Sequence, residues 1–471
     1  MSRLSPMIRE RRALALRIPE PIMPNADTQS SAFQLLLTPD KPALTVGGAT
    51  TLRVLVRVQA PDLPAGAVPR TPLHLALVLD RSGSMNGEPL SQAKRCARNI
   101  IDGLAPGDRA AIFAFDDEIE RIAPLSPASH KLALCAALDT IGSGGSTNLC
   151  GGWRAGADEL AAKLAGSDVH RVILLSDGGA NAGETDLEAI SGQCKTLAKV
   201  GVSTSTYGLG DNFNEALMLA MAAAGQGNAY YGQTAADLVE PFAAEFALLT
   251  SLCARGLVLK VNAPAEVSVK LQNHYTPVAE EAMAWALPDL AFAAEAWAML
   301  EITIPAGAPA LGEVLALPIT VSIQAAQKDS APLFLMAALP PLPVISAADR
   351  EAMPADELVA RRLLELDAAD ALEAVRAALA ADNWALAQQL ASAAQTRLAG
   401  NEWATAILAT MQRMIGARDK WFAMKEAAFA SRSMRSRLSS LDETRFCAGN
   451  EPSIRVFLRR KPEQGKGMPE S

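Results

Sequence analysis

The chain has 471 residues, with 43 Lys and Arg against 51 Asp and Glu, and its formal net charge is −8. This length is too great for one ordinary hydrophobic core and predicts roughly two to four domains. Half of the residues are apolar and a fifth are charged, which is typical of a globular protein. The negative charge disfavours general nucleic-acid binding, because that function needs a basic surface.

The two ends of the chain differ in composition from the rest. We expect a disordered or loosely ordered arm at residues 1–30, where positive charge and prolines occur without an apolar core of signal-peptide length. A short basic tail is expected at 443–471. No uncharged apolar run reaches about 18 residues, so no membrane span is expected. The predicted location is therefore cytoplasmic.

The cysteine pattern agrees with a reducing compartment. The six cysteines are far apart and form no C-x-x-C pair, which favours isolated buried thiols over a disulfide framework or a zinc site. They are Cys96, Cys135, Cys150, Cys194, Cys253 and Cys447.

Strand-like and helix-like segments divide the chain into regions. Residues 31–70 contain β-rich runs broken by Pro and Gly-Gly, which predict two or three antiparallel strands. In residues 71–255, apolar runs such as "LHLALVLD" and "HRVILLSD" alternate with helical patterns. This alternation predicts βαβ units and a doubly wound, Rossmann-like α/β domain with a parallel sheet. Residues 256–345 return to strands with period-two alternation.

Strands on both sides of the α/β region predict one β-sandwich into which the α/β domain is inserted. A Pro-rich stretch then leads to an α-helical C-terminal region at 346–442, with a turn expected at Asp382-Asn383. We interpret Trp384, Trp403 and Trp421 as part of the helix-packing core of this region.

Two apolar strands of the α/β region end in an aspartate, Asp80 in "LALVLD" and Asp177 in "VILLSD". Ser82 and Ser84 follow Asp80 at two-residue spacing, and Thr147 lies in the glycine-rich stretch "GSGGSTN". Ligands of open α/β sheets bind outside the carboxyl ends of the strands, where the strand order reverses. The three loops are therefore expected to bring these five side chains together.

Three hydroxyls and two carboxylates suit a hard cation. Mg²⁺ prefers oxygen ligands, and two carboxylates balance its charge while neutral hydroxyls complete the coordination. The alternate residues of an extended D-x-S-x-S segment face the same way. We therefore predict a site for Mg²⁺, with Mn²⁺ or Ca²⁺ as alternatives.

In this order on βαβ units, the five residues resemble the metal-ion-dependent adhesion site (MIDAS) of von Willebrand factor type A (VWA) domains. The resemblance covers roughly residues 70–255 and implies that Ser82, Ser84 and Thr147 contact the metal. It implies that Asp80 and Asp177 hold the metal directly or through water. It further implies that an acidic side chain of a partner protein completes the coordination, in a non-enzymatic interaction module, here a scaffold or adaptor in a bacterial cytoplasmic complex.

Within that family, "DRSGSM", "GGSTN" and "TYGLGDNFNE" are similar to bacterial VWA proteins that resemble inter-alpha-trypsin inhibitor heavy chains, many of them labelled calcium-activated chloride channel homologues. The chain is expected to depart from that group in having no full N-terminal inhibitor-type domain, no secretion signal and no membrane helix. Family members often work beside AAA+ ATPases of the MoxR type, so such an ATPase is the partner that the resemblance implies.

Other interpretations of these residues were weighed against the metal site. Asp80 and Ser82 alone could cap a helix, although a cap does not explain Thr147 and Asp177. The acidic stretch 116–118 is interpreted as a solvated hairpin turn. The alternative function is a metal-dependent phosphatase or other hydrolase that uses Asp80 as its nucleophile. Phosphatases of the haloacid-dehalogenase type need an acid two residues later, where this chain has Ser82.

Overall fold

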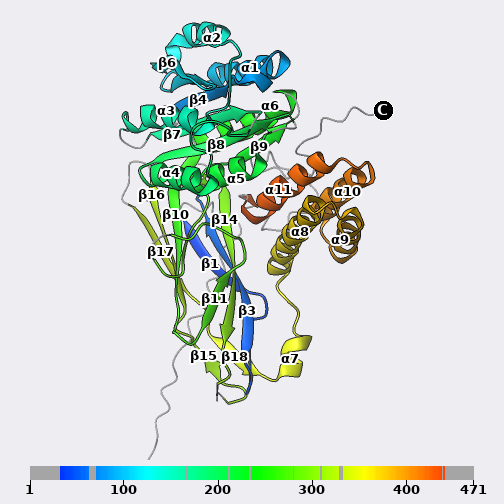
Figure 1. Cartoon of the computed structure of the whole chain (residues 1–471). Helices are drawn as coiled ribbons and strands as arrows, with labels where there is room; N and C mark the ends of the chain where they lie inside the picture. The colour runs from blue at the N-terminus through cyan, green and yellow to red at the C-terminus, as the bar shows by residue number, and fades with distance from the viewer. Residues whose placement is uncertain are drawn as a thin grey trace, which may run out of the picture.

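In the computed structural model, an α/β domain lies at one end of the molecule, a group of β-sheets lies at the other end, and a helical region lies alongside both (Figure 1). The predicted arm at 1–30 and tail at 443–471 lie outside the described residues. The structure describes residues 32–62, 71–164, 168–177, 179–210, 213–232, 235–278, 281–307, 310–327, 332–436 and 439–440.

The α/β domain contains a six-stranded sheet with the order β6-β5-β4-β7-β8-β9. Five of the strands run parallel, and only the edge strand β6 is antiparallel to its neighbour. From β4 the chain continues to β5 on one side and later to β7 on the other, so the strand order reverses between β4 and β7. The strands are β4 (Leu73–Asp80), β5 (Arg109–Phe115), β6 (Ile119–Pro127), β7 (Val169–Ser176), β8 (Val202–Leu209) and β9 (Ala229–Gly232).

Helices cover both faces of this sheet, as the sequence predicts. One hydrophobic cluster joins the sheet to α1, α2 and α6, and a second joins it to α3, α4 and α5. Leu75 and Leu77 of β4 face the first cluster and Ala76 and Val78 face the second, which explains why this strand is apolar throughout. The helices are α1 (Glu88–Gly103), α2 (Lys131–Asp139), α3 (Leu149–Ala161), α4 (Leu187–Lys199), α5 (Glu215–Ala224) and α6 (Ala235–Thr250), with 3₁₀ turns η1 (Gly83–Met85) and η2 (Ala128–His130).

The flanking strands form three further sheets. Their orders are β1-β3-β14-β11 with β19 paired to β14, β12-β10-β16-β17 with β13 paired to β10, and β15-β18-β2. The strands are β1 (Gln34–Pro39), β2 (Leu44–Thr45), β3 (Thr50–Gln59), β10 (Leu252–Asn262), β11 (Ser268–Leu271), β12 (Ala284–Ala286), β13 (Leu290–Ala291), β14 (Ala294–Ile304), β15 (Val314–Leu315), β16 (Thr320–Gln327), β17 (Leu333–Ala338), β18 (Leu342–Ile345) and β19 (Ser439–Ser440).

Strands from before and after the α/β domain pair directly. β3 and β14 are antiparallel and remain in register from Thr50 opposite Ile304 to Gln59 opposite Glu295. One hydrophobic cluster includes residues of β3 and β14 in one sheet and of β10 and β16 in another. The interpretation of this unit as one sandwich domain stays a prediction. In residues 31–70, β1 and β3 pair antiparallel, as the sequence predicts, and the two-residue strand β2 pairs parallel with β18.

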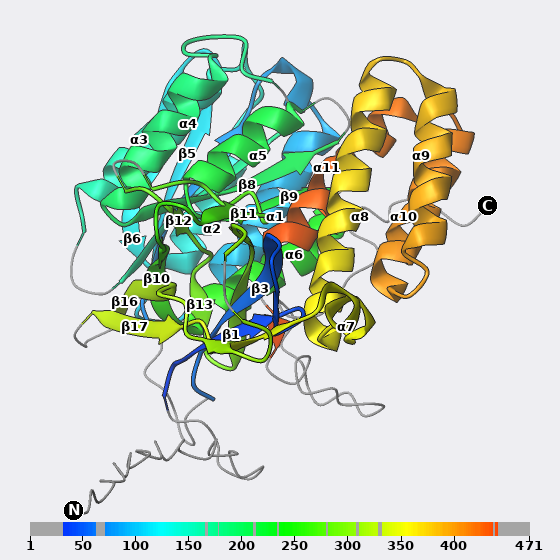
Figure 2. The same cartoon turned by 90° about the horizontal axis from the view of Figure 1, so that it is seen from below.

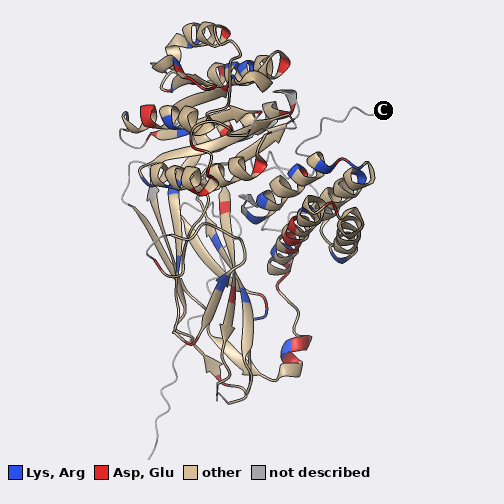
Figure 3. Cartoon of the chain, viewed as in Figure 1, with Lys and Arg blue, Asp and Glu red and all other residues tan. Residues whose placement is uncertain are grey.

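The helical region contains the predicted turn, since Asp382 adopts a positive φ of 54° between two helices. Charged residues of both signs lie along these helices, and Arg435 pairs with Asp370 (Figure 3). Trp403 is buried, but Trp421 is 63% exposed, so the prediction that Trp421 belongs to the core was wrong. The helices are α7 (Ala347–Ala352), α8 (Glu357–Ala380), α9 (Trp384–Arg397), α10 (Glu402–Gly416) and α11 (Lys420–Ser436).

The last described residues correct one further expectation. Ser439 and Ser440 form β19 on the edge of β14, although the sequence predicts helix up to residue 442. Among the described residues, no helix combines the length and apolarity that crossing a membrane requires. The five cysteines of the described ranges are buried and form no disulfide within these ranges, and Cys447 lies outside them.

Candidate metal site

The predicted site residues lie where parallel strands end. β4 ends in Asp80, and β7 ends in Ser176, directly before Asp177. These two strands are neighbours in the sheet, at the point where the strand order reverses. The side chains that follow them therefore meet at one edge of the sheet, where open α/β folds bind their ligands.

Asp80 is fully buried, and both of its carboxylate oxygens accept hydrogen bonds. Oδ1 accepts from the backbone N–H of Ser82 at 2.9 Å, and Oδ2 accepts from the hydroxyl of Ser176 at 2.5 Å. The helix-cap interpretation is wrong here, because Ser82 forms no side-chain capping bond to the following 3₁₀ turn and α1 begins after Gly87. Asp80 therefore orders the start of its own loop, and the side chain of Ser82 also forms a hydrogen bond to this carboxylate.

Ser84 connects the loops that follow β4 and β7. Its hydroxyl donates to Oδ1 of Asp177 at 2.8 Å and lies 3.3 Å from the hydroxyl oxygen of Ser82. Together with the bond between Ser82 and Asp80, these contacts link four of the five predicted residues into one chain. Ser84 is exposed, whereas Asp80, Ser82 and Asp177 are buried, so the group opens to solvent on the Ser84 side.

Thr147 lies on the third loop, and its backbone is bonded to the loop that follows β7. It is 3% exposed, its N–H donates to Oδ1 of Asn181 at 2.7 Å, and its carbonyl accepts from the N–H groups of Asn181 and Ala182. The glycine loop is also joined to the first loop, because Gly83 N–H donates to the carbonyl of Gly145 at 2.9 Å. The loop of Thr147 is thus bonded to both of the loops that carry the other four residues.

Burial is the main electrostatic feature of the two carboxyl groups. It raises the pKa of Asp80 to about 6, and the neighbouring charge of Asp177 adds a smaller increase. Burial also raises the pKa of Asp177, although the hydrogen bond from Ser84 opposes this shift. Such shifts mean that the ionised forms are poorly solvated and that a nearby cation would stabilise them.

The donor set fits a hard cation and no softer one. Within the described ranges, no three His, Cys, Asp or Glu side chains are grouped so that they could hold a metal. A metal at this edge would therefore depend on the hydroxyl oxygens as well as on the two carboxylates, which is the chemistry of Mg²⁺, Mn²⁺ or Ca²⁺.

Asp116 is a residue that the sequence interpretation missed. It was expected in a solvated turn, but it is 6% exposed and accepts hydrogen bonds from the N–H groups of Glu118 and Gly145. Arg81 contacts it as well, with Nε 3.2 Å from Oδ2. Burial opposes ionisation of Asp116, but these hydrogen bonds and the charge of Arg81 lower its pKa overall. Asp117 and Glu118 are exposed, as expected.

The glycine-rich loop contains the signal that could have identified Asp116. A Cβ atom on Gly144 would lie 1.7 Å from Oδ2 of Asp116, and one on Gly145 would lie 1.9 Å from Oδ1 of Asp117. No side chain can occupy such positions, so the glycines allow the acidic turn to hold the loop of Thr147. The sequence interpretation also missed Ser176, which donates to Asp80, and Asn181, which accepts from the N–H of Thr147. Neither residue belongs to a recognisable motif, so the sequence contains no signal for its role.

Both the sequence and the fold of this chain are similar to those of known proteins. The family model of the von Willebrand factor type A domain matches residues 74–244. The uncharacterized protein sll0103 of Synechocystis is 32% identical over 195 residues, which are 41% of this chain and 44% of that protein. The uncharacterized protein YfbK of Escherichia coli is 30% identical over 189 residues, 39% of this chain and 32% of that protein.

A human relative also matches this region. Inter-alpha-trypsin inhibitor heavy chain H4 is 27% identical over 162 residues, 32% of this chain and 17% of that protein. The chain thus spans less than half of the length of each of these three relatives.

Two solved structures share the fold over a longer range. A von Willebrand factor type A protein from Catenulispora acidiphila has a TM-score of 0.64 at 16% identity, covering 87% of this chain and 98% of that one. The ArnB paralog VWA2 from Sulfolobus acidocaldarius has a TM-score of 0.60 at 18% identity, covering 86% of this chain and 99% of that one. The family model and the fold agree over the same region, and we conclude that residues 74–244 form a VWA domain.

Proposed function

We propose that this protein captures a partner protein through a divalent cation held by Asp80, Ser82, Ser84, Thr147 and Asp177. VWA domains act as metal-dependent protein-interaction modules. The observation that carries the proposal for this chain is the linked group of hydroxyls and buried carboxylates at the end of β4 and β7. The largest cause of the raised pKa of both Asp80 and Asp177 is burial, which a nearby cation would oppose.

Each residue has a distinct part in this proposal. The hydroxyls of Ser82, Ser84 and Thr147 supply neutral oxygen ligands, and the carboxylates of Asp80 and Asp177 supply negative charge, directly or through water. The bound cation supplies a Lewis-acid position for a carboxylate of the partner. Arg81 is held by Asp116 and Glu120, so its charge is already compensated by this chain.

A pull-down with Mg²⁺ and with chelator tests the proposal. We expect a partner that is retained with Mg²⁺ and released by chelator, and we expect Thr147→Ala to fold normally but to lose the partner. Ser143→Ala is the matched control, because Ser143 lies on the same loop but is exposed and donates to Asn86. If Thr147→Ala retains magnesium-dependent capture, Thr147 is not a ligand and the proposed site is wrong.

The proposal includes a non-enzymatic role. Both carboxylate oxygens of Asp80 accept hydrogen bonds, and position 82, two residues later, is a serine and not an acid. We therefore expect no magnesium-dependent turnover of p-nitrophenyl phosphate above that of Asp80→Asn. Turnover that Asp80→Asn abolishes would favour a hydrolase and contradict this part of the proposal.

The metal and the partner can be defined further in the same assay. We propose Mg²⁺ as the resident cation, and calorimetric titrations with Mg²⁺, Mn²⁺ and Ca²⁺ compare it with the alternatives. We propose a cytoplasmic scaffold or adaptor role, in which a MoxR-type AAA+ ATPase is the first purified partner to test. Capture of that ATPase that ignores chelator would contradict its assignment to the metal site.

A further inference from the structure

Helix α11 of the C-terminal region is packed against the VWA domain. The contact lies beside the metal edge, which is the edge of the sheet where β4 and β7 end at Asp80 and Asp177. Figure 2 shows α11 between β9 and α8. Phe422 and Phe429 of α11 belong to the same hydrophobic cluster as Phe213 and Tyr231, which lie near the ends of β8 and β9. The rings of Tyr231 and Phe429 have their centres 4.7 Å apart. The helical region is therefore in direct contact with the edge of the sheet that carries the proposed site.

Two adjacent charged residues of α11 are buried in this contact. Lys425 is 1% exposed and Glu426 is 3% exposed. Burying an ammonium group costs several kcal/mol unless polar groups or π-electrons compensate it. Lys425 Nζ donates to the carbonyl of Gly210 at 3.3 Å and lies 4.1 Å from the centre of the Phe213 ring. The carboxylate of Glu426 accepts from the hydroxyl of Tyr231.

The two residues that Lys425 contacts lie on either side of the connection between β8 and α5. Gly210 directly follows β8, and Phe213 directly precedes Asn214, whose side chain caps α5 by accepting from Leu217 N–H. The side chain of Lys425 thus contacts the residue before this connection, Gly210, and the residue after it, Phe213.

The connection lies close to the loop that carries Asp177. A Cβ atom built on Gly179 would lie 3.7 Å from Cβ of Asn214, so the backbone of Gly179 is near the start of α5. Gly179 is two residues after Asp177, and β7 and β8 are adjacent strands. Lys425 and the loop of Asp177 are therefore both next to the same short segment, residues 213–214.

We propose that Lys425 is a positioning residue for the metal edge, so that the docking of α11 and the binding of the cation are coupled. Lys425 holds the connection between β8 and α5, and this connection supports the loop of Asp177. The coupling rests on the proposed function, because it requires that a cation binds at Asp177. Coupling is reciprocal, so the cation must also strengthen the docking of α11. The helical region then regulates the VWA domain and is not merely attached to it.

The first test uses the wild-type full-length chain with Mn²⁺ as the probe. Hydrogen exchange followed by mass spectrometry should show that Mn²⁺ slows exchange of the amides in residues 420–436 as well as in 177–184. If Mn²⁺ protects 177–184 but leaves 420–436 unchanged, the coupling is overturned while the proposed metal site stands. If Mn²⁺ neither binds nor protects any segment, both proposals fail.

The second test compares variants by calorimetric titration with Mn²⁺. Lys425→Met should weaken Mn²⁺ binding about five- to tenfold, the lower part of the usual range for coupled sites. Lys420→Met is the matched control, since Lys420 lies on the same helix but pairs with Asp382 on the surface and should leave the affinity unchanged. Phe429→Leu loosens the same contact without removing a charge and should weaken binding in the same direction. Unchanged affinity in a folded Lys425→Met protein would overturn the proposal.

Discussion

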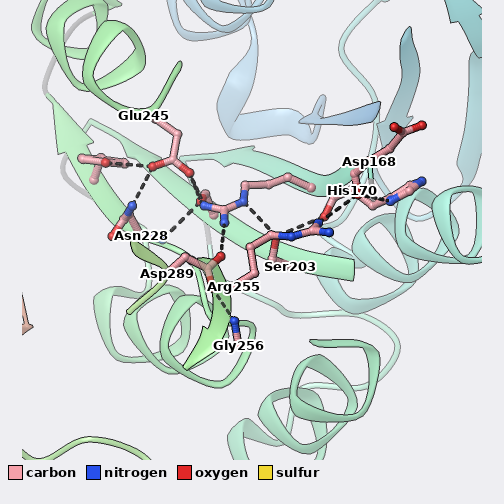
Figure 4. Close-up of polar contacts among 12 residues, drawn as sticks. Asp168, His170, Ser203, Asn228, Glu245, Arg255, Gly256 and Asp289 are labelled. Carbon is pink, nitrogen blue, oxygen red and sulfur yellow. Dashed lines mark hydrogen bonds and ion pairs between the residues drawn. The ribbon is translucent and has the colours of Figure 1, made fainter. Parts of the chain in front are cut away.

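The two ends of the sheet in the VWA domain each hold a buried group of charged residues, and the two groups differ in charge balance. At the metal edge, Asp80 and Asp177 are bonded only to hydroxyls and N–H groups in the described structure. Toward the other end, the guanidinium of Arg171 lies between two carboxylates (Figure 4). It donates to Glu245, and its Nη2 lies 3.8 Å from Asp289.

The group around Arg171 is complete. Ser203 accepts from Nε of Arg171 at 2.9 Å, and Asn228 donates to Oε2 of Glu245 at 2.7 Å. Burial opposes ionisation of Glu245, but the charge of Arg171 and hydrogen bonds from Ser205, Asn228 and Arg171 lower its pKa overall. At the metal edge the pKa values of both aspartates are raised instead. Glu245 therefore differs from the two aspartates because the charge of Arg171 opposes the effect of burial, although burial still raises the pKa of Asp289, the second carboxyl group beside Arg171.

This difference is the one expected between a structural group and the proposed metal site. Asp289 precedes β13 of the flanking sheets, so the pairing with Arg171 also joins those sheets to the VWA domain. Arg255 of β10 adds a second link, because its Nη1 donates to the carbonyl of Asp168 at 2.9 Å. The complete group closes an internal contact between domains, whereas the incomplete group leaves charge that a ligand from outside can balance.

Removing the first strands should have the largest effect. Deleting residues 32–60 removes β3, the partner of β14 over its whole length, so we expect the flanking sheets to unfold. The VWA domain should remain folded, with its metal response intact. Thermal melts followed by circular dichroism, with and without Mg²⁺, measure both. Independent unfolding of 256–345 at an unchanged temperature would show that the two strand regions are not one folding unit.

Removing the cation of the complete group should have the next largest effect. Arg171→Met leaves Glu245 buried without its cation, which typically costs about 3–5 kcal/mol of folding free energy. Urea denaturation measures the loss. Arg154→Met is the control, because Arg154 forms an exposed pair with Asp158 and should cost less than about 1 kcal/mol. Equal losses for both variants would mean that the buried pairing of Arg171 contributes no more to the folding free energy than an exposed ion pair does.

Adding a cation to the incomplete group should stabilise it. At a free Mg²⁺ concentration 100 times its dissociation constant, binding adds about 2.7 kcal/mol. For a domain of this size, the melting temperature should rise by roughly 5–10 °C. A wild-type melting curve that is indifferent to millimolar Mg²⁺ would contradict the metal site.

Asp80→Asn should shrink or abolish this response. Without metal, the variant should gain some stability, because a buried charge is removed. Burial contributes more than Asp177 to the raised pKa of Asp80, so the gain comes from avoided desolvation more than from relieved repulsion. The loss of a carboxylate that accepts from Ser82 and Ser176 partly offsets it. Melts of both proteins with Mg²⁺ and with chelator measure this reversal.

Glu426 is a buried carboxyl group in the contact between α11 and the end of β9. Burial raises its pKa from 4.5 to about 7, although the hydrogen bond from Tyr231 opposes the shift. The folded state therefore binds more protons than the unfolded state between these values, and stability falls as the pH rises from about 4.5 through 7. Glu426→Gln should remove this fall and be more stable than wild type by about 1–2 kcal/mol at pH 8. Parallel stability curves of the two proteins from pH 5 to 8 would contradict the assignment.

Local patterns were sufficient for much of the fold. The apolar run of β4 predicted a strand buried on both faces, and the alternation of strands and helices predicted the doubly wound sheet. The D-x-S-x-S spacing and the two strand-end aspartates predicted which side chains meet, since parallel strands end at one edge. Trp421 was placed wrongly because helical spacing does not reveal which face a neighbouring helix covers.

What the sequence by itself determined about this protein is the set of candidate metal ligands and the type of domain that presents them. The tertiary structure alone decided which residues support those ligands. Asp116 reaches the loop of Thr147 across 29 residues of chain, and Lys425 reaches Gly210 across 215. The physical reason is that strand and helix patterns depend on residues a few positions apart. Hydrogen bonds between loops depend on folded geometry, which no local spacing encodes.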